Sequence, residues 1–191
     1  MKLLPWIKLI RWQNLIMLLL VHLLLRFVVF PKFGVVPFLS SNQFLLLSIS
    51  CILVMAGGYI VNDIIDISTD KINKPEKVII EKSISISSAK IAYILLSVTG
   101  LSIGLYLGSL TGKTVNYLWH PVTLLLLIIY SKYLKNSFLY GNILIGLLIF
   151  ISMILIPFFD LFPGGDQVNP KQDPAIFNVV LIFGIFAFML T

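Results

Sequence analysis

Residues 62–75 read Asn-Asp-Ile-Ile-Asp-Ile-Ser-Thr-Asp-Lys-Ile-Asn-Lys-Pro, and they directly follow an apolar stretch that is long enough to cross a bilayer. On an α-helix, Asn62, Asp66 and Asp70 are spaced four residues apart, and Asp63 precedes Asp66 by three. This spacing puts Asp66 and Asp70 on one face. Like charges one turn apart repel each other, so an anionic stripe at a membrane edge calls for a cation.

A hard divalent ion fits this stripe, because the stripe offers oxygen ligands without Cys or His. Mg²⁺ in particular is usually held by one or two carboxylates together with the phosphates of a substrate. The stretch therefore points to a diphosphate that carries magnesium. The alternative is a solvated helix end whose carboxylates only pair with Lys71, Lys74 and Lys77.

The composition is that of an integral membrane protein. Of the 191 residues, 59% are hydrophobic and 12% are charged, and the mean hydropathy is +1.02. A soluble fold of this length lacks the interior to hide so much apolar side chain. The formal net charge of +6 does not indicate a nucleic-acid partner, because the Lys and Arg residues are spread over short loops, which membrane topology explains better.

Hydropathy predicts an all-α fold, a polytopic transmembrane helical bundle with about six spans. His22 and Arg26 lie in the first span, where we expect structural roles, with Arg26 reaching the membrane surface. Cys51 lies in the second span and is expected to be a small core residue. The approximate bounds of the spans are 15–30, 44–61, 91–110, 117–130, 138–159 and 175–190.

Small and apolar residues indicate how these helices pack. Met55 and Tyr59 precede Asp63 at intervals of four, so they are expected to continue its face inward, as an apolar wall or as plain core. Glycines allow another helix to approach closely. We expect such contacts at Gly57 and Gly58 and along the stripe of Gly100, Gly104 and Gly108.

The distribution of positive charge predicts which side each loop faces. The amino terminus and the loops after spans two and four hold ten Lys and Arg residues, and the opposite side holds three. We therefore expect a multi-pass protein of the inner or plasma membrane with its amino terminus and acidic motif in the cytoplasm. Asp160, Asp166 and Asp173 then fall in an outer loop, where we expect them to be solvated. Residues 1–14 mix Lys and Arg with Trp and Ile, which suits the headgroup layer.

Three features together resemble one known family. They are the amino-terminal Asn14, a span that ends in Asn-Asp-x-x-Asp-x-x-x-Asp at 62–70, and a lysine-bearing cytoplasmic loop that follows it. This order is similar to that of the UbiA superfamily of intramembrane prenyltransferases. Residues 70–77, Asp-Lys-Ile-Asn-Lys-Pro-Glu-Lys, resemble the Asp-Lys-Ile-Asn-Arg-Pro-Asp-Arg stretch of the branch that builds ether-lipid precursors from geranylgeranylglyceryl phosphate.

The resemblance implies Mg²⁺-dependent transfer of a prenyl group, geranylgeranyl in that branch, from a prenyl diphosphate to a membrane-associated acceptor, there a glyceryl phosphate lipid. It implies catalytic roles for Asp66 and Asp70, since a metal held there neutralises the charge on the departing diphosphate. The metal ligands that it implies are Asn62, Asp63, Asp66 and Asp70. The substrate-binding residues that it implies are Asn14, Tyr59, Lys77, Tyr130 and Lys135.

The family also has about nine spans and a second acidic motif in a later cytoplasmic loop, whereas this sequence ends at Thr191, after the sixth predicted span. We therefore expect residues 1–191 to form a single transmembrane prenyltransferase domain that is incomplete at its carboxy terminus. Without the second motif, we expect this chain alone to have little or no transferase activity.

Three alternatives stay open. The acceptor could be an aromatic, quinone-type ring instead of a lipid. The chain could be a truncated, non-catalytic membrane protein. A CDP-alcohol phosphotransferase also places spaced Asp residues and Mg²⁺ at the end of a membrane helix, but its pattern has Gly directly after the second Asp, where this chain has Ile67.

Overall fold

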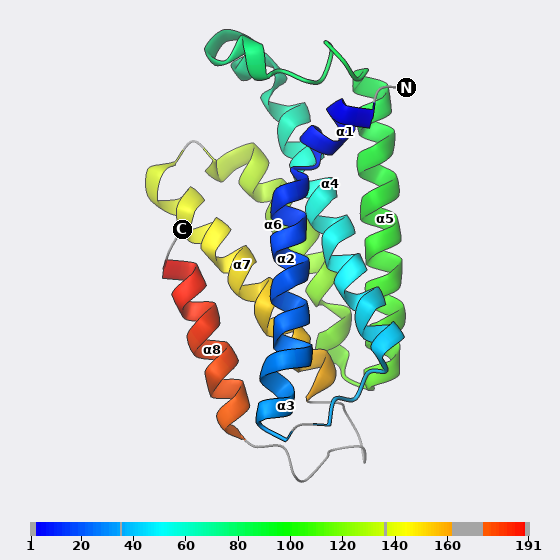
Figure 1. Ribbon diagram of the computed structural model, residues 1–191. Helices are drawn as coiled ribbons and strands as arrows, with labels where there is room; N and C mark the ends of the chain where they lie inside the picture. Colours follow the sequence, from blue (N-terminus) through cyan, green and yellow to red (C-terminus); the bar gives the residue numbers. More distant parts are fainter. Residues whose placement is uncertain (1–2, 35, 136, 162–173, 190–191) are drawn as a thin grey trace.

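The computed structural model describes residues 3–34, 36–135, 137–161 and 174–189 as a bundle of helices (Figure 1). Five segments of the described residues are long and apolar enough to cross a membrane, which confirms the polytopic, all-α prediction. They are Trp12–Lys32, Ser41–Asn73, Ile86–Thr111, Thr114–Leu134 and Leu139–Asp160. The sixth predicted span coincides with helix α8 (Pro174–Met189), which has 16 residues and packs beside α7.

The other elements follow the predicted order. The first crossing consists of α2, the π-helical segment η1 and α3, and the fourth consists of the 3₁₀ turn η3, α6 and the π-helical segment η4. The bounds are α1 (Leu3–Leu9), α2 (Trp12–Leu24), η1 (Leu25–Val29), α3 (Phe30–Lys32), α4 (Ser41–Asn73), η2 (Pro75–Lys77), α5 (Ile86–Thr111), η3 (Thr114–Tyr117), α6 (Trp119–Ile129), η4 (Tyr130–Leu134) and α7 (Phe138–Asp160).

Helix α4 is the element that carries the acidic motif beyond the apolar zone. It begins at a capping box, in which the Ser40 hydroxyl accepts from the Gln43 backbone and the Gln43 side chain accepts from the Ser40 backbone. It ends at Asn73, shortly before Pro75. Its 33 residues extend about 50 Å, against about 30 Å for the hydrocarbon core of a bilayer. The last turns of α4 therefore project from the apolar zone.

The predicted glycine contacts are confirmed. Gly57 approaches the Ser97 hydroxyl on α5, and Gly58 approaches Leu127 on α6. On α5, Gly100 lies against the backbone of Ser50, while Gly104 lies against the ring of His120. A side chain at any of these glycines would collide with its neighbour, so the helices approach each other closely only because glycine stands there.

The loop between α4 and α5 folds back over the end of the bundle. Ile80 and Ile84 form a short bridge, and both are buried in one apolar cluster with Leu9 of α1 and Ile60 of α4. Glu81, between the two isoleucines, adopts a left-handed backbone with φ of 73°. Figure 1 shows this loop and α1 at the same end of the bundle, drawn at the top. The loop and α1 therefore cover the end at which the acidic motif lies.

At the opposite end, Asp160 is not solvated, and the prediction that it would be was wrong. Its side chain is fully buried, and its carboxylate lies 2.5 Å from the guanidinium of Arg26, which is 6% exposed. The backbone N–H of Leu39 donates to the same carboxylate, and Arg26 donates to the Leu39 carbonyl. Contrary to the prediction, Arg26 therefore does not reach the membrane surface. Its charge is paired with the buried carboxylate of Asp160, and without that partner it would be unpaired in an apolar interior.

This ion pair joins the first crossing, the loop before α4 and the end of α7. Asp166 and Asp173, which were expected to be solvated with Asp160, lie outside the described residues. His22, also in the first crossing, is buried and hydrogen-bonded to Ser48 and to the carbonyl of Ser152. Both ionisable residues of the first span therefore hold helices together, as the sequence analysis expected in general terms.

We predict that removing one member of the buried pair destabilises the protein strongly. Arg26→Met or Asp160→Leu alone should lower the free energy of unfolding by roughly 3–5 kcal/mol, because each leaves one unpaired buried charge. The double variant should lose less than either single variant. Denaturation in mixed micelles measures all three values. Single-variant losses that simply add in the double variant would contradict the pairing.

Candidate active site

A cavity of about 730 Å³ opens at the end of the bundle that carries the acidic motif. Helices α2, α4, α6 and α7 line it, with charged side chains at its mouth and apolar ones deeper in. The structure brings all nine residues that the sequence analysis singled out to this one cavity. They are Asn14, Tyr59, Asn62, Asp63, Asp66, Asp70, Lys77, Tyr130 and Lys135.

Asp66 lines the mouth of the cavity. It is 8% exposed and accepts a hydrogen bond of 2.9 Å from the Asn62 amide one turn earlier on α4. The same carboxylate oxygen forms an ion pair with the ammonium of Lys135, which follows η4. A π-helical turn contains an additional residue, so it changes which side chains after it face a neighbouring helix. The loop after η4 thereby supplies the cation for Asp66.

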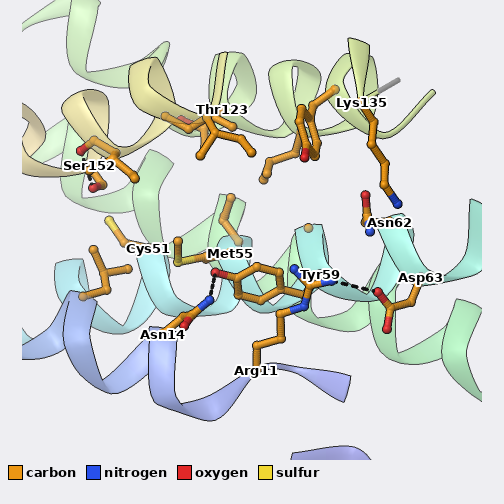
Figure 2. A pocket seen from close by; sticks show the side chains of 18 of the residues that line it. Arg11, Asn14, Cys51, Met55, Tyr59, Asn62, Asp63, Thr123, Lys135 and Ser152 are labelled. Atoms are coloured by element: carbon orange, nitrogen blue, oxygen red, sulfur yellow. Dashed lines mark hydrogen bonds and ion pairs between the residues drawn. The ribbon is translucent and has the colours of Figure 1, made fainter. Parts of the chain in front are cut away.

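Asp63 is paired from the other side of the mouth. The Arg11 guanidinium lies 3.2 Å from its carboxylate and 4.7 Å from the centre of the Tyr59 ring, and the Asn14 amide donates to the Tyr59 hydroxyl over 3.0 Å. Figure 2 shows these four side chains in contact along α2 and α4. Arg11 has a left-handed backbone, with φ of 53°, where the chain turns from α1 into α2.

Arg11 is a site residue that was not predicted from the sequence. Residues 1–14 were interpreted as a basic, aromatic segment for the headgroup layer, and Arg11 was assigned no site role there. Its partner Asp63 is 52 residues away in the chain. Lys8 and Lys74 also line the mouth without having been singled out. Only the folded arrangement identifies these cations.

The oxygen atoms at the mouth fit a magnesium ion. The side-chain oxygen of Asn62 is buried and has no hydrogen-bond partner among the described residues, so it is available as a ligand. Asp63, Asp66 and Asp70 line the same cavity. The described residues contain no group of three or more His, Cys, Asp or Glu side chains that could hold a metal by themselves. The Asn62 oxygen and the three carboxylates therefore suit Mg²⁺ that is bound partly by the protein and partly by the phosphates of a substrate.

The ion pair between Lys135 and Asp66 affects how a metal ion can bind at this carboxylate. Burial lowers the pKa of Lys135, while the carboxylate of Asp63 acts in the opposite direction. The ammonium therefore needs an anion close by. A metal ion at Asp66 would displace Lys135 from that carboxylate, and a phosphate group would give Lys135 a new partner. The site is thus suited to a metal and a phosphate group that arrive together.

The fold and the cavity together define a polytopic helical membrane protein with a charged intramembrane cavity. The chain belongs to the UbiA prenyltransferase family, whose sequence model matches residues 19–191. This match confirms the resemblance seen in residues 62–77. It also favours the prenyltransferase interpretation over that of a CDP-alcohol phosphotransferase.

Two curated relatives of this chain carry the same name. Digeranylgeranylglyceryl phosphate synthase of Saccharolobus solfataricus is 35% identical over 120 residues, which cover 59% of this chain and 41% of the relative. The protein of the same name from Hyperthermus butylicus is 30% identical over 186 residues, which cover 96% of this chain and 57% of the relative. The chain therefore spans about half the length of the curated relatives that it matches.

A solved structure described as concerning digeranylgeranylglyceryl phosphate synthase in membranes has the same fold. It superimposes with a TM-score of 0.68 over 95% of this chain and 59% of that chain, at 24% sequence identity. The superposition supports the arrangement of the helices that line the cavity.

We predict that Lys135 opposes the binding of a divalent ion that arrives without phosphate. Lys135→Met should raise the affinity for Mn²⁺ alone by roughly tenfold, because a positive charge about 4 Å away costs on the order of 1–4 kcal/mol. The same variant should weaken retention of a prenyl diphosphate with Mg²⁺. Titration followed by the electron paramagnetic resonance of free Mn²⁺ measures the first effect.

The matched control is Lys132→Met, because Lys132 is exposed on the preceding turn and does not line the cavity. This control should leave both affinities within about twofold of wild type, as surface substitutions generally do. Equal changes in Mn²⁺ affinity for the two variants would show that Lys135 does not compete for the metal-binding carboxylates.

Proposed function

We propose that the protein to which this chain belongs transfers a prenyl group from a prenyl diphosphate to a glyceryl phosphate lipid in the membrane. The observation that carries the proposal is the cavity itself, which joins an oxygen-lined, charged mouth to an apolar interior. A prenyl diphosphate has the same two parts. The names of the curated relatives support a geranylgeranyl donor and a glyceryl phosphate acceptor.

In this proposal the carboxylates and the cations of the mouth act together. Asn62, Asp63, Asp66 and Asp70 would hold Mg²⁺, and a bound Mg²⁺ would neutralise charge on the departing diphosphate. Lys135 and Arg11 would leave their carboxylates and pair with phosphate oxygens. Lys77, which also lines the mouth, would add a third cation. These contacts favour breaking of the allylic C–O bond, because they are strongest to the oxygen on which charge develops.

The interior would protect the reacting carbon. Leu127, Ile145 and Leu148 line the cavity below the mouth and exclude water from the allylic cation. The rings of Tyr59 and Tyr130 also line the cavity, where their faces can stabilise positive charge. The diphosphate would leave with the electrons of the broken C–O bond, and the acceptor oxygen would then bond to the allylic carbon and give up its proton to the released diphosphate.

The charge balance at the mouth favours an acceptor that carries phosphate. Three carboxylates line the mouth, those of Asp63, Asp66 and Asp70, together with five cationic side chains, those of Lys8, Arg11, Lys74, Lys77 and Lys135. With Mg²⁺ bound, the excess of positive charge would be larger still. A diphosphate and a phosphate monoester together would offset it, whereas a neutral aromatic ring would not.

The orientation in the membrane remains part of the proposal. The amino terminus, the end of α4 and the loop after η4 lie at one end of the bundle (Figure 1). Together with the loop between α4 and α5, the start of α5 and η4, these segments hold ten of the Lys and Arg residues. By the positive-inside rule, this end and the acidic motif face the cytoplasm.

The test is product formation in membranes from cells that express the full gene, supplied with Mg²⁺, radiolabelled geranylgeranyl diphosphate and geranylgeranylglyceryl phosphate. Wild type should form a doubly prenylated glyceryl phosphate, and removal of Mg²⁺ with a chelator should abolish it. Asp66→Asn should reduce the rate at least 100-fold, since a lost metal ligand removes transition-state stabilisation.

The matched control is Glu76→Gln. Glu76 is exposed, follows the motif closely and does not line the cavity, so its loss should leave the rate within about twofold of wild type. Asp160→Asn is unsuitable as a control because Asp160 belongs to the buried ion pair. Equal losses in Asp66→Asn and Glu76→Gln, or a product only with an aromatic acceptor, would contradict the proposed function.

A further inference from the structure

We propose that the floor of the cavity sets the length of the prenyl chain, and that the floor formed by Cys51, His120 and Ser152 admits a chain of twenty carbons. This inference rests on the proposed function, because it assumes that the apolar part of the cavity holds the prenyl chain. Figure 2 shows the cavity along its length, with Asp63 and Lys135 at one end and Cys51 and Ser152 at the other.

The depth of the cavity can be estimated from the rise of helix α4. Asp66 and Cys51 both line the cavity and both lie on α4, which is a single α-helix from Ser41 to Asn73. They are fifteen residues apart, which corresponds to about 22 Å along the helix axis. A twenty-carbon prenyl chain has four main-chain carbons per unit, and with bonds of about 1.5 Å it extends to about 20 Å. The two lengths agree.

Below this floor, to which Leu155 on α7 also contributes, the bundle is filled. Leu155 belongs as well to the large apolar cluster that occupies the other half of the bundle. In that cluster Phe44, Leu47, Leu107 and Ile156 are fully buried. Packed side chains at this density leave no room for a further prenyl unit unless the helices move apart.

Hydrogen bonds between helices hold the floor in place. The Nε2 atom of His120 lies 2.8 Å from the Ser50 hydroxyl, which links α6 to α4. His22 on α2 hydrogen-bonds to Ser48 on α4 and, over 3.1 Å, to the carbonyl of Ser152 on α7. All four helices that line the cavity are thus joined at the depth of the floor. Such a floor resists displacement by a longer chain.

The cavity reaches this depth because Cys51 and Ser152 are small. Both side chains are partly exposed in the structure and line the cavity. A larger side chain at either position would fill the last part of the cavity and leave the mouth unchanged. Cys51 was expected from the sequence to be a small core residue, and its small size leaves space at the floor of the cavity.

The test measures Mg²⁺-dependent binding of prenyl diphosphates with ten, fifteen and twenty carbons to the protein expressed from the full gene, in lipid nanodiscs. Wild type should bind the twenty-carbon diphosphate most tightly. Cys51→Phe should weaken binding of the twenty-carbon diphosphate at least tenfold and leave that of the ten-carbon diphosphate within about twofold, because only the longer chain reaches the floor. Ser152→Leu should have the same selective effect.

The control is Ile49→Phe, which places the same side chain on α4 at a position that is exposed on the outside of the bundle. Unchanged binding of the ten-carbon diphosphate also shows that each variant is folded. Equal effects of Cys51→Phe on both chain lengths, or no effect on either, would overturn the inference. If wild type binds none of the three diphosphates, the proposed function itself fails.

Discussion

The structure depends on how the negative charges at the end of α4 are compensated. Asp63 and Asp66 lie where the helix leaves the apolar zone, and each has a cationic partner from a different part of the chain. Arg11 comes from the turn between α1 and α2, and Lys135 comes from the loop after η4. A carboxylate in such a place without a partner would be costly. The two ion pairs therefore connect the segments that form the mouth and neutralise the carboxylates of Asp63 and Asp66.

The two halves of the bundle differ in their packing and in the exposure of their ion pairs. The half away from the motif is packed with apolar side chains and contains the Arg26–Asp160 pair, which is buried and has backbone partners. The half near the motif contains the cavity, and its ion pairs are more exposed. A binding site benefits from this combination, because a ligand can replace the exposed ion pairs at the mouth while the packed half away from the motif keeps the fold rigid.

The sequence predicted the features that depend on local spacing. The apolar runs gave the helices, and the four-residue spacing of Asn62, Asp66 and Asp70 placed the acidic stripe on α4, which is helical throughout. The resemblance to a known family pointed to nine residues that the structure brings to one cavity.

What the sequence could not show were pairs of residues that are far apart in the chain. Arg26 and Asp160 were assigned to the membrane surface and to a solvated loop, because neither position reveals its partner. His120 had no assigned role until the structure placed it against Ser50 and Gly104. Long-range ion pairs and hydrogen bonds leave no periodic pattern, so only the fold reveals them.

The most direct measurement of the central idea is electron-nuclear double resonance of Mn²⁺ bound to the protein with a non-reactive geranylgeranyl thiodiphosphate. We expect a phosphorus coupling that shows the metal bound directly to the diphosphate, and loss of that coupling in Asp66→Asn. A wild-type spectrum with water ligands alone, or a phosphorus coupling that persists unchanged without Asp66, would contradict this expectation.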